Sequence, residues 1–253
     1  MNRTPIIAGN WKMYKGGSAG PELARAIVTA CGDLAGVSLV LAPPFTVLAE
    51  VVRAVSGSRV EVAGQNLYPK PEGAFTGEVS APMLLDAGCK WVIIGHSERR
   101  QFFGETDEGV REKTAAAMAA GLRPIVCIGE TLAERDAGKT LDVVHRQLDA
   151  FSSVLAERPG FGTIAYEPVW AIGTGKVAGP EQAQEVHHAL RQRLTQKDAT
   201  LGRSTHILYG GSVKPDNASG LLSCPDVDGA LVGGASLDAG SFAKIVEACP
   251  SRV

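Results

Sequence analysis

The sequence predicts an α/β fold in which eight parallel strands close into a barrel surrounded by helices, the (β/α)8 architecture. Short apolar runs rich in β-branched residues recur eight times along the chain, and strands of this kind belong to parallel sheets that are covered on both faces. Longer amphipathic segments separate these runs, as crossover helices do in a parallel sheet. The length of 253 residues is ordinary for a single (β/α)8 barrel.

The expected elements alternate in order along the chain. The strands, each a short apolar run, are expected at residues 6–8, 37–42, 60–64, 91–94, 124–128, 163–166, 206–209 and 229–232. The clearest helices between them are expected at residues 21–30, 107–120, 141–155, 180–194 and 242–248. An open doubly wound sheet is the alternative, but no G-x-G-x-x-G motif follows the first strand to support it. Neither a linker nor a change in composition divides the chain, so we expect one catalytic domain over residues 1–253.

Composition and charge narrow the class of protein. The chain is 45% hydrophobic and 21% charged, which is typical of a globular protein. A net charge of −2 provides no general basic field for nucleic acid or an anionic membrane. The five cysteines are an odd number without C-x-x-C spacing, which argues against disulfides and zinc and suits a reducing compartment. With no secretory signal and no apolar run of roughly 18 residues, we expect a cytoplasmic protein.

Most of the unusual polar and glycine residues follow directly after an expected strand. Any one of these clusters is also explained by turn chemistry. Barrel active sites, however, are built from the loops at the carboxyl ends of the strands, so the shared placement predicts a site at that end. The residues concerned are Asn10, Lys12, Gln65, Gly95, His96, Ser97, Glu98, Gly129, Glu130, Glu167, Gly210, Gly211, Ser212, Gly233 and Gly234.

Glu167 is predicted to be a proton-abstracting base. Pro168 favours an extended conformation at Glu167, which therefore ends a strand, although a salt-bridged structural carboxylate is an equal alternative from position alone. The apolar run VWAI at 169–172 then lies in a loop, where exposure is unfavourable unless the loop closes over something. A lid beside the carboxylate explains both features, because closure removes water from the site. The predicted lid is Pro168, Val169, Trp170, Ala171, Ile172, Gly173, Thr174, Gly175 and Lys176.

His96 follows the apolar run WVIIG and is expected at the beginning of a helix. The positive end of the helix dipole disfavours imidazolium, so we expect a neutral ring that donates one hydrogen bond. A histidine that only caps its own turn is the structural alternative. Lys12, with Asn10 nearby, can hold an anionic substrate or polarise a carbonyl. His96 and Glu98 lack an accompanying metal-binding motif, so we expect no metal.

Two glycine pairs follow the seventh and eighth strands, in YGGSV (209–213) and LVGGAS (231–236). Their backbone N–H groups can approach a phosphate, which barrels commonly bind at this position. A carboxylate base, a neutral histidine, a cation, phosphate-binding loops and a lid together suit proton transfer beside a carbonyl, as in an aldose–ketose isomerisation. This set of groups requires no cofactor.

Eight motifs spread over almost the whole chain carry a family resemblance. They are AGNWKM (8–13), GQN (64–66), GAFTGEVS (73–80), GHSERR (95–100), FGETDE (103–108), AYEPVWAIGTGK (165–176), YGGSV (209–213) and DGALVGGAS (228–236). They resemble the motifs of the triosephosphate isomerase family. The resemblance implies a TIM barrel that interconverts dihydroxyacetone phosphate and D-glyceraldehyde 3-phosphate through an enediol(ate), without a cofactor.

The resemblance also implies a role for each candidate residue. Glu167 shuttles the proton, while His96 and Lys12 stabilise the charge that develops on oxygen. Asn10 orients the substrate, and Glu98 is similar to a carboxylate of the family that supports the site. The residues that the resemblance assigns to phosphate binding are Gly173, Ser212, Gly233 and Gly234.

The irregular stretch 66–77 is expected to contact a partner subunit. Long loops within a compact domain are usually functional or packed, and the tip GAFTG is apolar and small. The family is typically a homodimer in which this loop enters the neighbouring subunit, which places Thr76 near the neighbour's site. Gln65 and Phe75 are expected at the same interface.

Two other functions are considered. A different phosphosugar enzyme on the same barrel is one alternative. A metal-dependent epimerase requires clustered metal ligands, which the sequence lacks. A Schiff-base aldolase requires a lysine that ends a central strand, whereas Lys12 lies two residues beyond Asn10. A catalytically silent barrel that acts as a binding protein is disfavoured because all the candidate groups are present together. Departures from the family pattern are few: Tyr14 lies near the expected interface, and Val177 and Gly179 replace hydroxyl residues beyond the lid.

Overall fold

Eight parallel strands close into a barrel in the computed structural model, which describes residues 3–32, 34–172 and 178–250. Because β1 pairs with both β2 and β8, the predicted (β/α)8 barrel is confirmed and the open sheet is excluded. The strand bounds agree with the expected ones to within two residues. They are β1 (Ile6–Asn10), β2 (Ser38–Ala42), β3 (Val60–Gly64), β4 (Trp91–Ile94), β5 (Arg123–Ile128), β6 (Thr163–Tyr166), β7 (His206–Tyr209) and β8 (Gly229–Val232).

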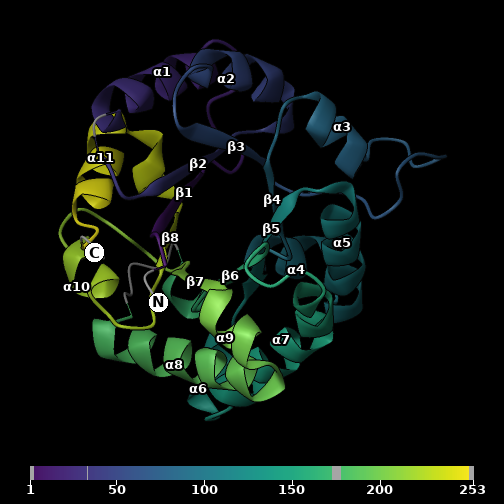
Figure 1. The fold of residues 1–253 in the computed structure, drawn as a ribbon, viewed down its shortest axis with the longest axis vertical. Helices are drawn as coiled ribbons and strands as arrows, with labels where there is room; N and C mark the ends of the chain where they lie inside the picture. The colour runs from purple at the N-terminus through teal and green to yellow at the C-terminus, as the bar shows by residue number, and fades with distance from the viewer. Residues whose placement is uncertain (1–2, 33, 173–177, 251–253) are drawn as a thin grey trace.

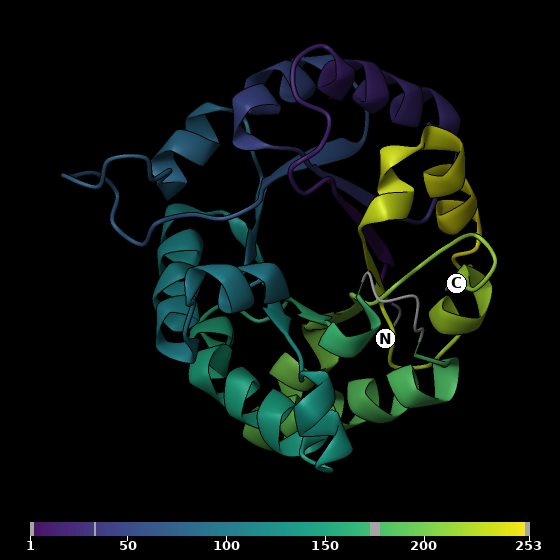
Figure 2. The ribbon, with the colours of Figure 1, turned by 180° about the vertical axis from the view of Figure 1, so that it is seen from behind.

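Helices surround the barrel in chain order, and α11 lies beside α1, where the ring closes (Figure 1). The reverse view shows the same continuous ring (Figure 2). The expected long helices are α1 (Ala19–Cys31), α5 (Asp107–Ala120), α7 (Thr140–Ala156), α8 (Pro180–Lys197) and α11 (Ala239–Glu247). The shorter ones are α2 (Leu48–Val55), α3 (Ala81–Asp86), α4 (Ser97–Phe103), α6 (Leu132–Asp136), α9 (Ala199–Ser204) and α10 (Ala218–Leu222), with 3-10 segments η1 (Phe45–Val47), η2 (Val169–Ala171) and η3 (Gly234–Leu237).

Local sequence signals explain where several helices begin and end. Thr106 precedes α5 and accepts a hydrogen bond from the Gly109 amide at 3.1 Å, which satisfies one of the free N–H groups of the first turn. Gly121 ends the same helix with a φ of 86°, a conformation that glycine adopts without steric cost. Pro180 occupies the first turn of α8, where its missing N–H is not needed.

The core consists of two apolar clusters, because successive strand residues point to opposite faces. The larger cluster lies between the strands and the helices. The smaller one fills the barrel interior and consists of Ile6, Ala8, Val40, Ala42, Ala63, Trp91, Ile93, Ile125, Cys127, Ala165, Leu208 and Leu231. The same alternation directs Arg123, Thr163 and His206, each the first residue of its strand, toward the interior at the opposite end from Glu167.

The register of β5, β6 and β7 aligns the residues that follow these strands. Ile128 pairs with Tyr166, and Tyr166 pairs with Tyr209. Backbone hydrogen bonds continue beyond the strands, from the Glu167 amide to Ile128 O and from the Gly210 amide to Tyr166 O, both at 2.7 Å. The parallel sheet therefore places Glu167 at the centre of the carboxyl end of the barrel.

The stretch 66–77 contains no helix or strand and extends away from the barrel between β3 and α3 (Figure 1). Within the chain, the Phe75 ring packs against Tyr68 with ring centroids 4.3 Å apart. Phe75 remains 38% exposed. Across the described residues, none of the helices combines the length and the apolar character that crossing a membrane requires.

Candidate active site

A cavity of about 600 Å³ opens at the carboxyl ends of the strands and brings together seven of the residues predicted to act in catalysis or substrate binding. They come from the loops after β1, β4, β6, β7 and β8, as expected for a (β/α)8 barrel. The seven residues are Asn10, Lys12, His96, Glu167, Ser212, Gly233 and Gly234. Glu98 and Gln65 line a smaller adjoining cavity of about 230 Å³, which also includes Lys12 and His96. Phe75 and Thr76 line neither cavity.

Glu167 is 1% exposed, and its carboxylate is held between two groups from the loop after β4. Oε2 accepts a hydrogen bond from the Ser97 amide at 2.8 Å. Oε1 lies 2.9 Å from Nε2 of His96. A buried carboxylate with a backbone donor and an imidazole beside it is positioned to exchange a proton with a molecule in the cavity.

His96 both caps α4 and lies in the cavity, so the two alternatives for this residue are compatible. Its Nδ1 accepts a hydrogen bond from the Glu98 amide at 3.3 Å, which leaves Nε2 as the protonated nitrogen that faces Glu167. Burial is the largest single influence on the pKa of His96 and lowers it, but the charge and hydrogen bond of Glu167 together with the charge of Glu98 outweigh burial, and the net direction is upward. The helix dipole and the Glu167 carboxylate thus act on the pKa of His96 in opposite directions.

Lys12 occupies a left-handed backbone conformation with a φ of 51°, which is uncommon for residues other than glycine and clusters at functional sites. Two side chains stabilise this turn. Asn10 Oδ1 accepts from the Lys12 amide at 3.0 Å, and Gln65 Nε2 donates to the carbonyls of Lys12 and Ala42, both at 2.8 Å. The Lys12 ammonium donates to Glu98 Oε1 at 2.6 Å. Gln65, expected at an interface, thus also supports the Lys12 turn.

The glycine loops after β7 and β8 line the cavity, and Gly210 packs directly against Glu167, since an added Cβ atom would lie 2.8 Å from Glu167 Cγ. Gly233 packs beside Lys12, since a Cβ atom added to Gly233 would lie 3.5 Å from the Lys12 Cε atom. The 3-10 segment η3 begins at Gly234, the second glycine of the pair after β8, so a short helical turn starts at this loop. The Ser212 carbonyl accepts from the Asn217 side chain at 3.0 Å, which orders the loop after β7.

The described beginning of the lid is anchored by a buried carboxylate, a role that the sequence did not reveal. Glu130 is fully buried and accepts from the Tyr166 hydroxyl at 3.1 Å and from the Trp170 indole at 2.8 Å. Arg135 lies 3.5 Å from Glu130 and stacks over the Trp170 ring at 4.4 Å. Four predicted lid residues, Gly173, Thr174, Gly175 and Lys176, lie outside the described residues, as does Val177.

Gln147, on α7, is a second residue that the sequence analysis missed. Its amide pairs with both backbone groups of Gly129, accepting from the N–H at 2.7 Å and donating to the carbonyl at 3.3 Å. Gly129 packs so closely on the next strand that an added Cβ atom would lie 1.7 Å from the Glu167 carbonyl oxygen. Gln147 therefore holds the peptide segment against which the Glu167 backbone rests.

All five cysteines are free thiols, and all but Cys249 are buried. Burial raises the pKa of Cys31 to about 11 and that of Cys89 to about 12, which suppresses the reactive thiolate. Burial, and then the charge of Glu167, raises the pKa of Cys127. Within the described residues, no group of three or more His, Cys, Asp or Glu side chains is placed to hold a metal ion.

Comparison with known proteins places this arrangement in a family. A family model described as triosephosphate isomerase matches residues 5–249. Curated proteins named triosephosphate isomerase are similar over nearly their whole length. The protein of Rhodopirellula baltica is 52% identical over 253 residues, covering 99% of this chain and 100% of the relative. That of Moorella thermoacetica is 53% identical and that of Chloroflexus aurantiacus 51%, each covering 96% of this chain and 98% of the relative. The chain therefore belongs to the triosephosphate isomerase family.

Proposed function

We propose that this protein interconverts dihydroxyacetone phosphate and D-glyceraldehyde 3-phosphate, with Glu167 as the base that moves the proton. The observation that carries this proposal is the convergence of the Glu167 carboxylate, the His96 imidazole and the Lys12 side chain on one cavity. The family membership of the chain and of its relatives supports the reaction.

The phosphate of the substrate is proposed to bind between Lys12 and the glycine loops. Ser212, Gly233 and Gly234 line the same side of the cavity, and backbone N–H groups at such loops bind phosphate well. Gly173 is proposed as a further phosphate-binding residue from the family motif, and it lies outside the described residues. Bound in this way, the substrate presents its carbonyl group toward His96 and the adjacent carbon toward Glu167.

The proton transfer is proposed to proceed in two symmetrical steps. Glu167 removes a proton from the carbon beside the carbonyl, and the electron pair of that C–H bond forms the enediol(ate) as charge moves to the carbonyl oxygen. His96 Nε2 and the Lys12 ammonium stabilise this oxygen, and Asn10 orients it. A proton then passes from the hydroxyl of the deprotonated carbon to the former carbonyl oxygen, with His96 Nε2 between the two oxygens. The protonated Glu167 returns its proton to the former carbonyl carbon as the new C=O bond forms on the other carbon. The Glu98 carboxylate accepts from the Lys12 ammonium and the Glu98 amide donates to Nδ1 of His96, so Glu98 supports the positions of these two groups.

The lid is proposed to exclude water while the proton moves. Its described part, from Pro168 to Ile172, connects directly to Glu167, and the Val169 amide donates to the Glu130 carbonyl at 3.1 Å. Ile172 lines the cavity, so an apolar side chain of the lid already faces the substrate position. Exclusion of water strengthens each electrostatic contact in the site.

The direct test is an assay of isomerisation in both directions, with purified protein and a coupling enzyme for each product. We expect turnover without added metal and unchanged turnover after treatment with a chelator. Loss of activity on chelation, with recovery on adding a divalent cation, would favour a metal-dependent phosphosugar enzyme instead. The free cysteines are consistent with the predicted cytoplasmic location. Both this location and the single catalytic domain over residues 1–253 stay predictions.

We also propose that the active form is a homodimer in which the 66–77 loop contacts the partner. Thr76 is proposed to approach the partner's site, with Gln65 and Phe75 at the interface. Several large apolar side chains near this loop and the Lys12 turn are exposed in the single chain, which suits a covered surface. They are Met13 at 92%, Tyr14 at 59%, Phe102 at 68% and Phe103 at 67%.

A charge placed on the loop is expected to dissociate the dimer. Phe75→Asp would bury a carboxylate at the interface, so sedimentation should show a monomer at concentrations where the parent protein is dimeric, with reduced turnover. Leu141→Asp is the matched control, since Leu141 is 38% exposed on α7. A parent protein that is monomeric and fully active at nanomolar concentration would contradict the dimer.

A change at Gln147 is expected to act on turnover through the position of Glu167. In Gln147→Glu, the carboxylate still accepts from the Gly129 N–H but opposes the Gly129 carbonyl, and loss of such a contact typically costs enough to lower kcat about tenfold. Protonation restores a donor. Activity relative to the parent should therefore rise as pH falls through the pKa of the new carboxyl, which burial raises.

The control for this prediction is Gln147→Leu, which lacks both hydrogen bonds at every pH. Gln147 and Gly129 line a further cavity, and the charged groups around it are the same in all three proteins. These groups therefore cannot cause a difference between the pH profiles of kcat. These groups are Arg100, Glu105, Asp107, Glu134, Arg146 and Glu167. Superimposable pH profiles of kcat for the parent, Gln147→Glu and Gln147→Leu would show that Gln147 does not position the base.

A further inference from the structure

A second polar cavity, of about 390 Å³, lies at the other end of the barrel, where the strands begin. The first residues of β2, β4, β5 and β7 contribute to it, together with two arginines outside the strands. Its principal lining residues are Arg3, Ser38, Trp91, Arg123, Arg203 and His206. Because most of these residues belong to barrel strands, the cavity has a rigid frame.

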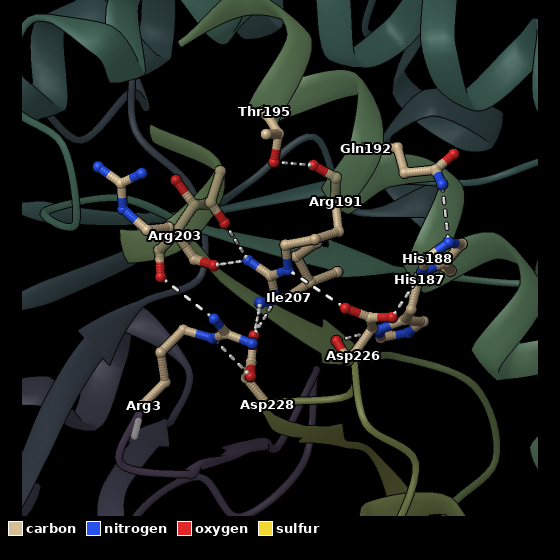
Figure 3. Close-up of polar contacts among 12 residues, drawn as sticks. Arg3, His187, His188, Arg191, Gln192, Thr195, Arg203, Ile207, Asp226 and Asp228 are labelled. Carbon is tan, nitrogen blue, oxygen red and sulfur yellow. Dashed lines mark hydrogen bonds and ion pairs between the residues drawn. The ribbon is translucent and has the colours of Figure 1, made fainter. Parts of the chain in front are cut away.

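Of the three arginines that line this cavity, Arg3 alone forms an ion pair among the described residues, and Arg191, which shares its carboxylate, also lies 3.6 Å from Asp226. Arg3 forms an ion pair with Asp228 at 2.8 Å, but the same carboxylate also pairs with Arg191, as Figure 3 shows. Asp228 is thus already shared by two guanidinium groups. Arg3 also donates to the backbone carbonyl of Arg203 at 3.1 Å, so the backbone at Arg203 lies next to the Arg3 guanidinium.

Neither Arg123 nor Arg203 forms an ion pair with a carboxylate in the described part of the chain. Arg123 stacks over the Trp91 ring at 4.1 Å and directs Nε toward the Phe161 carbonyl at 3.5 Å. Glu61 is engaged with the Trp91 indole at 2.6 Å. The Arg203 guanidinium donates to the Thr200 hydroxyl at 3.3 Å. Burial lowers the pKa of Arg123, although Glu61 partly opposes it, so the guanidinium is held in a desolvated position.

Two buried polar atoms at this end lack a hydrogen-bond partner among the described residues. They are Thr163 Oγ1 and His206 Nδ1. Thr163 and His206 are register partners on β6 and β7, and Thr163 is 1% exposed. His206 Nε2 lies 3.1 Å from the Thr4 carbonyl and is therefore the protonated nitrogen of a neutral ring. Buried polar atoms in proteins normally have partners. Because His206 lines the cavity, its Nδ1, unpartnered among the described residues, indicates an occupant that carries a hydrogen-bond donor.

We propose that the amino-terminal mouth of the barrel binds a small oxyanion of the phosphate type, held chiefly by Arg123 and Arg203. Guanidinium groups bind such oxyanions through paired N–H donors. Arg3 supplies further positive charge, and the unprotonated Nδ1 of His206 can accept a hydrogen bond from the hydroxyl of a hydrogen phosphate. The site is separate from the catalytic cavity and does not depend on the proposed reaction. The chain as a whole has a net charge of −2, so the positive charge of these arginines is local, and a bound anion would neutralise it.

The test follows inorganic phosphate binding by NMR of the histidine side chains, at constant ionic strength maintained with sodium chloride. His206 reports on the mouth and His96 on the catalytic cavity, so the two sites are resolved in one titration. We expect the His206 signals to shift to saturation. In Arg123→Gln/Arg203→Gln the apparent affinity at His206 should fall at least tenfold, while the titration of His96 is unchanged.

Arg25→Gln, a charge-matched change at an exposed position on α1, is the control and should leave both titrations as they are. Arg203→Gln alone serves if the double variant does not fold, because Arg203 is exposed; it should weaken binding at His206 in the same direction. His206 signals that stay constant while His96 responds, or that respond equally in parent and variants, would overturn the proposal and indicate that water occupies the mouth.

Discussion

Replacing Glu167 with glutamine is expected to lower kcat by about 10²–10⁴-fold, the usual contribution of a positioned acid–base group. Glutamine has nearly the same volume, and its amide oxygen can still accept from the Ser97 amide, as the carboxylate does at 2.8 Å. The amide nevertheless has no basic electron pair for a carbon-bound proton. KM should change little, because the groups proposed to bind the phosphate are Ser212, Gly233 and Gly234 and not the Glu167 carboxylate. The coupled assay in both directions measures both constants.

Glu157→Gln is the control for this substitution, since Glu157 lies at the exposed end of α7 and carries the same charge. Its kcat should equal that of the parent. If Glu167→Gln retains kcat within threefold of the parent, another group abstracts the proton and the proposed role of Glu167 is wrong. That result would leave the proposed isomerase reaction itself untouched.

Replacing His96 with glutamine is expected to reduce kcat by about 10²–10⁴-fold as well, because the Nε2 donor that faces Glu167 is lost. The same change removes the side-chain cap of α4, which typically costs about 1 kcal/mol of stability. The two effects are separated by measuring kcat and the free energy of unfolding on each variant.

His96→Asn distinguishes the two roles further, because asparagine is a good helix cap but has no imidazole. We expect His96→Asn to recover the stability lost in His96→Gln and to remain catalytically impaired. His188→Gln, at an exposed histidine of α8, should affect neither quantity. A fall in kcat below tenfold in both His96 variants would reduce His96 to a structural cap.

The strands were predictable from the sequence because their signal is local. Each is a short β-branched run, and its bounds in the structure match the expected ones closely. Long helices such as α5 and α8 were predictable for the same reason, since their apolar periodicity extends over several turns. Short helices such as α3 and α10 were not predicted, because five or six residues complete too little of the helical period to show it.

The candidate site was predictable as a set of residues, but not as a set of contacts. Position after a strand was enough to single out Glu167, His96 and Lys12, since all carboxyl ends of the strands meet at one end of the barrel. That His96 caps α4 and also faces Glu167 required the structure. The upward direction of its pKa, opposite to the expectation from the helix dipole, depends on where the Glu167 carboxylate points.

The sequence by itself determined the barrel, its eight strands and the end at which the chemistry gathers, because alternation and turn residues act through neighbours along the chain. Only the tertiary structure decided which groups support that chemistry. Gln147 is 18 residues from Gly129 along the chain, and no local pattern connects them. The same holds for Arg123 and Arg203 at the amino-terminal mouth, which closure of the barrel brings to one cavity and which have no ion-pair partner among the described residues.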